Sequence, residues 1–87
     1  MNVAGRFGEN LAHLRKRAGL SQEDASFRAG LHRTEVSSLE RGKRLPRVDT
    51  VAKLAGAVKA NPGELFEGIA WEPGELRPGR FELPDQD

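Results

Sequence analysis

The amino-acid sequence predicts an all-α fold, a bundle of five short helices followed by a C-terminal arm that is not helical. Apolar residues recur at helical spacing over the first two thirds of the chain, and capping residues, glycines and prolines divide this pattern at short intervals. From residue 70 onward, Pro-Gly pairs alternate with single large apolar residues instead. In this chain of 87 residues we therefore expect one helical domain, 1–69, and an acidic, Pro/Gly-rich tail, 70–87.

The composition excludes several kinds of protein. Hydrophobic residues make up 37% and charged residues 31% of the chain, and cysteine is absent, so we expect no disulfide, no metal site and no cofactor. No apolar run reaches the roughly 18 residues that span a bilayer, and no signal peptide opens the chain, which favours a cytoplasmic protein without membrane contact. The two histidines, His13 and His32, have no acid placed to orient them, so an enzyme is not expected.

The first two helices are defined by the residues at their ends. The first is expected over residues 3–18, with Gly19 terminating it. Its inner face carries Phe7, Leu11 and Leu14. The second is expected over residues 22–29, because Ser21 and Asp24 have the spacing of a capping box at its start. The small residues that would let a neighbouring helix approach it closely are Ala25, Ser26 and Ala29.

The third helix, residues 33–41, follows a tight turn at Gly30 and has two distinct faces. At roughly 100° per residue its polar and cationic residues share an arc of about 140°, while Val36 and Leu39 lie on the opposite side. The polar arc contains Arg33, Thr34, Ser37, Ser38 and Arg41. Two short helices joined in this way form a helix-turn-helix, which places its second helix in the major groove of DNA. The alternative is an ordinary solvated face of an amphipathic helix.

The remaining helices follow a basic loop, residues 43–47, in which Pro46 disfavours helix at the residue before it. A fourth helix is expected over residues 49–59, and its inner side would be formed by Val48, Val51, Leu54, Ala55 and Val58. The Asn-Pro-Gly-Glu segment that begins at Asn61 is a strong start signal for a fifth helix, 62–67. The apolar residues that this helix should bury are Leu65 and Phe66.

The net charge of +1 conceals an asymmetry along the chain. Residues 1–59 contain 12 Lys or Arg and 6 Asp or Glu, a balance of +6, whereas residues 60–87 contain 2 and 7, a balance of −5. The basic excess is densest in the third helix and in the loop after it. In a helix-turn-helix protein, the phosphates of a duplex would lie beside these segments.

Four segments together resemble the lambda-repressor-like DNA-binding domains, and more narrowly the Cro/repressor (XRE) family of transcriptional regulators. They are SQED, the run FRAGLHRTEVSSLERG, the basic loop ending in proline, and NPGELF. The resemblance covers about residues 6–69. It implies a five-helix lambda-repressor-like bundle that binds specific sequences of double-stranded DNA as a prokaryotic-type transcriptional regulator, with residues 33–41 in the major groove. Because so small a unit makes few base contacts, we expect a homodimer on an inverted repeat, and we expect it to be nucleoid-associated.

The resemblance assigns roles to individual residues. Bases would be read by Arg33, Thr34 and Ser38, with Ser37 close by. Phosphates would be contacted by Gln22, Arg41, Lys43, Arg44 and Arg47. Arg15 and Glu40 match a pair that commonly forms a salt bridge in this family, which would fix the angle of the recognition helix. The alternative for that pair is two independent surface charges, which contribute little.

The chain departs from the family pattern in the second helix, where Ala25 replaces the usual leucine and Ser26 the usual alanine. Losing a core leucine should cost on the order of 2–5 kcal/mol unless neighbouring side chains fill the space. We expect Phe27 or the aromatic residues of the tail to fill it.

The tail, 70–87, allows two interpretations, in which Trp71 and Phe81 either extend a small core or bind a second subunit. The candidate contacts to a second subunit or to a partner protein are Leu65, Phe66, Trp71, Phe81 and Leu83. In a competing function, the chain is an antitoxin or adaptor that holds another protein through its tail, and its DNA binding is autoregulatory.

Overall fold

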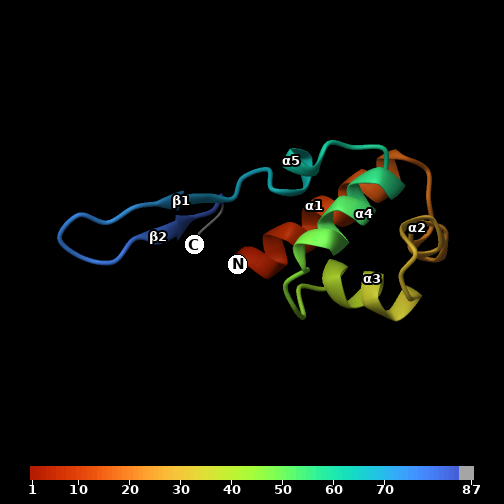
Figure 1. Cartoon of the computed structure of the whole chain (residues 1–87), viewed down its shortest axis with the longest axis horizontal. Coiled ribbons are helices and arrows are strands. Elements are labelled where there is room, and N and C mark those ends of the chain that lie inside the picture. Colours follow the sequence, from red (N-terminus) through yellow and green to blue (C-terminus); the bar gives the residue numbers. More distant parts are fainter. Residues whose placement is uncertain (85–87) are drawn as a thin grey trace.

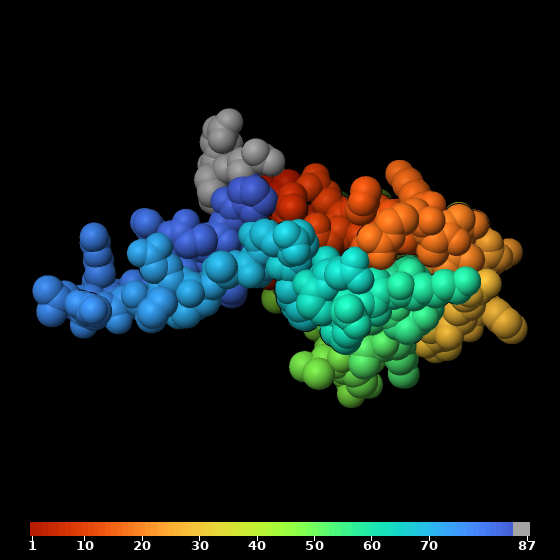
Figure 2. Space-filling view, turned by 90° about the horizontal axis from the view of Figure 1, so that it is seen from above, coloured from red at the N-terminus to blue at the C-terminus, as the bar shows by residue number. Residues whose placement is uncertain are grey.

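The computed structural model describes residues 1–84, in which five helices precede a two-stranded hairpin (Figure 1). The elements are α1 (Val3–Arg17), α2 (Gln22–Ala29), α3 (Arg33–Glu40), α4 (Val48–Ala57), α5 (Pro62–Leu65), β1 (Ala70–Glu72) and β2 (Arg80–Glu82). The helices form a bundle from which the hairpin projects, giving extents of 46 × 25 × 20 Å (Figures 1 and 2). The all-α class is confirmed, and the non-helical arm is a hairpin as far as it is described. Residues 85–87 of the predicted tail lie outside the described part.

Local capping interactions place the helix ends close to where the sequence predicts them. The hydroxyl of Ser21 accepts the main-chain N–H of Asp24 at 2.9 Å, and the carboxylate of Asp24 accepts that of Ser21 at 3.1 Å, so the expected capping box starts α2. Gly30 ends α2 with a left-handed φ of 67°. The later helices end one or two residues before the expected positions. No helix among the described residues is long and apolar enough to cross a bilayer.

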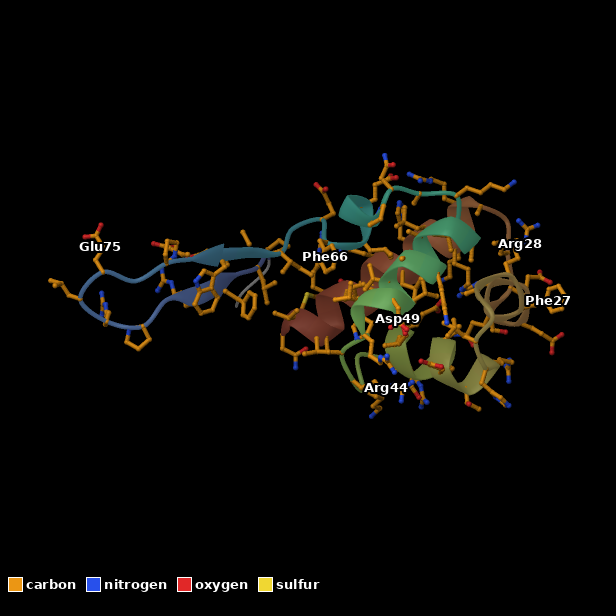
Figure 3. The ribbon with its side chains drawn as sticks, in the orientation of Figure 1. Phe27, Arg28, Arg44, Asp49, Phe66 and Glu75 are labelled. Atoms are coloured by element: carbon orange, nitrogen blue, oxygen red, sulfur yellow. The ribbon has the colours of Figure 1, made fainter. Side chains whose placement is uncertain are left out.

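The hydrophobic core lies between α1, α3, α4 and α5, and α2 packs on α3 and α4. Its largest fully buried side chains are Phe7, Leu11, Val36, Leu39, Leu54, Val58 and Leu65. Ala25 is fully buried, and the buried Ser26 donates its hydroxyl to the main-chain oxygen of Glu23 at 2.7 Å. The expectation that Phe27 fills space beside Ala25 is wrong, because Phe27 points outward and is 87% exposed (Figure 3).

Two further expectations about burial are corrected. Val48, predicted on the inner side of its helix, is 88% exposed. It is the first residue of α4 and precedes the turn that packs on the core. Phe66, predicted to be buried, is 44% exposed, because α5 ends at Leu65 and Phe66 is only its capping residue. The Phe66 ring still contacts Phe7, with 6.0 Å between the ring centroids.

The hairpin pairs β1 and β2 in antiparallel register, with Trp71 directly opposite Phe81. The two rings meet edge to face with their centroids 5.0 Å apart. Each ring remains about half exposed, at 56% for Trp71 and 49% for Phe81. The interpretation that these aromatics extend the helical core is therefore wrong, and they do not fill the space beside Ala25 either.

Candidate nucleic-acid interface

The turn between α2 and α3 fixes the orientation of the third helix. The main-chain N–H of Leu31 donates to the oxygen of Ser26 at 2.9 Å, which closes the turn around Gly30. His32 precedes α3 without capping it through its side chain. On the inner side of α3, Val36 and Leu39 are almost fully buried. Burial of this side leaves the opposite side of α3 facing solvent.

The four residues predicted to read bases differ in how far they project. Arg33 and Thr34, in the first turn of α3, are exposed. The Thr34 hydroxyl lies 3.2 Å from Nδ1 of His32. Ser37 and Ser38 are half-buried, one turn further along. The first turn of α3 therefore presents one long cationic side chain and one methyl-bearing side chain, followed by a shallow polar surface.

The cations predicted to contact phosphates line the end of α3 and the loop that follows. Arg41 caps α3, and its Nε donates to the main-chain oxygen of Ser37 at 3.3 Å. Lys43 is exposed. Arg44 forms a 3.0 Å ion pair with Glu35 of α3 and projects on the side of the bundle where α3 lies (Figure 3).

Arg47 and Gln22 complete the predicted phosphate set. Arg47 forms a 3.3 Å ion pair with Asp49, although its own side chain is 84% exposed. Gln22 is half-buried, and its amide donates to the carboxylate of Glu40 at 3.0 Å. Gln22 thus has a structural contact that the sequence analysis did not anticipate.

Arg15 and Glu40 form a two-contact ion pair between α1 and α3. Nε and Nη2 of Arg15 lie 2.6 Å and 3.0 Å from the two carboxylate oxygens of Glu40. A third nitrogen, Nη1, donates to the main-chain oxygen of Leu20 at 2.8 Å. The side chains are only 11% and 6% exposed. The hydrogen bonds to Glu40 raise the pKa of Arg15 against the opposing effect of burial. The pair is therefore a buried, satisfied network and not two independent surface charges.

An apolar groove of about 570 Å³ lies beside the basic loop. It is lined by Val3, Phe7, Leu45, Pro46, Val48, Val51, Ala52, Pro62 and Phe66. Leu45 and Val48 are 62% and 88% exposed, so the groove leaves apolar surface in contact with solvent. Sequence reasoning missed it, and the one available signal was a leucine inside an otherwise basic loop.

The structure places the residues that were predicted to contact a second subunit in different surroundings. Leu65, predicted as such a contact, is fully buried and cannot touch another chain, so that prediction is wrong. Phe66 lines the groove, while Trp71, Phe81 and Leu83 belong to the hairpin or its end. Within residues 1–84, no cluster of three or more His, Asp or Glu side chains could hold a metal ion.

Comparison with known proteins gives consistent matches over the helical bundle. A family model described as a helix-turn-helix domain matches residues 6–67. An uncharacterized HTH-type transcriptional regulator of Sinorhizobium fredii is 42% identical over 65 residues, which are 75% of this chain and 84% of that protein. Control protein C.BamHI of Bacillus amyloliquefaciens is 33% identical over 67 residues, which are 76% of this chain and 83% of that protein.

A solved structure matches the same region. The restriction-modification controller protein C.AhdI of Aeromonas hydrophila superposes with a TM-score of 0.70 at 43% identity. The match covers 72% of this chain and 96% of that one. The bundle therefore corresponds to nearly the whole of that protein.

Proposed function

The chain belongs to the helix-turn-helix family of DNA-binding transcriptional regulators, and on this premise we propose that it reads specific sequences by inserting α3 into the major groove as a two-fold dimer. The observation that carries this proposal is the exposed first turn of α3, with Arg33 and Thr34 at the surface and a basic loop beside it. Residues 1–69 form the DNA-binding module in this proposal. The 43% identity to a restriction-modification controller protein supports a small regulator of that type. We also propose that it works at the nucleoid in the cytoplasm.

Arg33 is the main reader of sequence in this proposal. Its guanidinium can donate two hydrogen bonds to O6 and N7 of one guanine, which discriminates against other bases by about 1–3 kcal/mol. The methyl group of Thr34 can contact a thymine methyl. Ser37 and Ser38 are too short to reach far into the groove, so they contribute weaker readout, including contacts through water.

The basic loop and the start of α2 bind the phosphates on either side of the groove. Arg41, Lys43, Arg44 and Arg47 supply positive charge, and Gln22 begins α2, whose terminal N–H groups and dipole favour an anion. The ion pairs of Arg44 and Arg47 are surface interactions of little net stability, so a phosphate can replace Glu35 or Asp49 as the partner.

The apolar groove forms the centre of the dimer interface in this proposal. One copy of so small a domain makes few base contacts, and a two-fold dimer doubles them over half-sites about 34 Å apart. Val48 and Phe66 supply exposed apolar surface that a second copy would cover. Sedimentation velocity should therefore give a dimer for the wild type and a monomer for Val48→Asp. Because Val48 is so exposed, this substitution should leave the fold intact.

Selection of bound duplexes from a random pool tests the role of Arg33. Arg33→Ala should abolish the preference at one guanine position per half-site and retain binding to random DNA. Lys43→Ala, the matched control, should weaken binding to all sequences alike and preserve the selected motif. If Arg33→Ala also lowers affinity uniformly and leaves the motif unchanged, Arg33 contacts phosphate and the assignment of base reading is wrong.

A further inference from the structure

The hairpin has one apolar face and one charged face. Because Trp71 and Phe81 are paired directly, they lie on the same face of the hairpin and form its aromatic face. Ile69 and Leu83 lie just outside the paired strands. On the other face, Arg80 forms ion pairs with Glu72 at 3.7 Å and with Glu82 at 3.1 Å.

The base of the hairpin is held on α1, so the arm projects in a defined direction. Nε of Arg6 donates to the main-chain oxygen of Glu67 at 3.0 Å. The side-chain amide of Asn10 donates to the oxygens of Leu65 and Glu67, each at 2.9 Å. Ile69, the next large apolar residue, packs against the helical core. The hairpin therefore starts beside the core and continues outward as an arm that stands clear of the bundle (Figures 1 and 2).

An uncovered aromatic face on such an arm needs a partner. A two-stranded hairpin in water is marginally stable unless its apolar face packs on something else. Trp71 and Phe81 already contact each other, yet about half of each side chain is exposed. Large half-buried aromatics of this kind are enriched at the centres of protein interfaces.

We propose that each hairpin lays its aromatic face on a second copy of the chain, adding an exchanged arm to the groove-centred dimer, and this inference rests on that proposed dimer. Phe66 lines the groove, and β1 begins only four residues later, so a copy bound at the groove lies next to the base of the arm. A stable interface takes about 20–30 residues on each side, and two reciprocal arms would add contact area to the apolar surface of the groove.

Trp71 is the only tryptophan, so intrinsic fluorescence reports on the arm alone. The full-length protein is diluted through its dimer–monomer transition, followed in parallel by sedimentation and by quenching of Trp71 with acrylamide. We expect the quenching constant to rise at least about twofold as the dimer dissociates, and to be high at every concentration in the monomeric Val48→Asp variant. If Trp71 is quenched as readily in the dimer as in the monomer, the proposed arm contact is wrong, while the proposed dimer through the groove is not contradicted. A wild type that remains monomeric on its operator overturns both.

Two phenylalanine substitutions provide a second test. Phe81→Ser should raise the dimer dissociation constant by more than about tenfold, the effect of losing an interface anchor. Phe27→Ser removes a ring that is more exposed, 87% against 49% for Phe81, at the opposite end of the molecule, and it should change the constant by less than about twofold (Figure 3). If both substitutions change the dimer dissociation constant by less than about twofold, the proposal is wrong, and the aromatic face would then bind a different protein.

Discussion

A Cβ atom on Gly8 of α1 would lie 2.6 Å from the main-chain oxygen of Glu40 at the end of α3. It would lie even closer to the oxygen of Leu39. Real Cβ atoms do not approach other atoms this closely, and these neighbours are backbone atoms that cannot rotate away. The glycine therefore lets α1 and α3 meet along their backbones, and the position of the recognition helix depends on this contact.

Gly8→Ala should lower the free energy of unfolding by about 1–3 kcal/mol, because the added methyl group must push α3 away from α1. Specific DNA affinity should fall further than the folded fraction accounts for, since α3 is displaced relative to the basic loop. Chemical denaturation and operator titration of the same preparation measure the two effects. Gly56→Ala is the matched control, because Gly56 lies in α4 with nothing near the added Cβ. It should stabilise the protein by about 0.5–1 kcal/mol. Equal stabilities of Gly8→Ala and the wild type would contradict the prediction.

The buried pair of Arg15 and Glu40 should behave as a unit in a double-mutant cycle. Arg15→Met or Glu40→Leu alone leaves one charge buried without its partner and should cost about 3 kcal/mol of unfolding free energy. The double variant should cost clearly less than the two single losses combined, since it leaves no orphan charge. Arg17→Met, which removes an exposed ion pair with Glu64, should cost less than about 1 kcal/mol. Additive losses in the cycle would mean that the two groups act independently.

Features set by neighbouring residues could be predicted from the sequence. The capping box of Ser21 and Asp24 and the left-handed turn at Gly30 depend on side chains within three residues and on backbone sterics. For that reason the bounds of α2 match the expectation of 22–29. The helix-turn-helix and its family could be identified for the same reason, since its signals all lie within one short segment.

Features that depend on distant parts of the chain could not be predicted. Val48 has the helical spacing of a core residue, but it is exposed because α4 begins there. Gln22 lies on the helix that precedes the recognition helix, and only the fold reveals its hydrogen bond to Glu40. The aromatic pair of Trp71 and Phe81 requires the strand register, which the irregular spacing of prolines and glycines does not specify.

The salt dependence of DNA affinity should reveal how many phosphates the basic loop contacts. If Lys43 neutralises one phosphate, Lys43→Gln removes one counterion-release contribution. The slope of log K against log salt concentration should then become shallower by about 0.9 for each protomer. Lys59→Gln is the control, because Lys59 follows the end of α4 that lies away from α3 (Figure 1). It should leave the slope unchanged. Equal slopes for Lys43→Gln and the wild type would mean that Lys43 does not contact a phosphate.

Two helix caps should make the stability fall at acid pH. The main-chain N–H and the hydroxyl of Ser21 lower the pKa of Asp24, and the N–H of Asn61 together with Arg17 lowers that of Glu64. Because both pKa values are lower in the folded state, the caps contribute fully above about pH 5 and are lost as the pH falls through the folded values, below about pH 4. Asp24→Asn combined with Glu64→Gln should therefore be less stable than the wild type at neutral pH and converge with it at about pH 2. Urea denaturation at several pH values measures this, with Glu75→Gln in the exposed hairpin loop as the control. Parallel profiles for the wild type and the double variant would show that the caps do not cause the acid dependence.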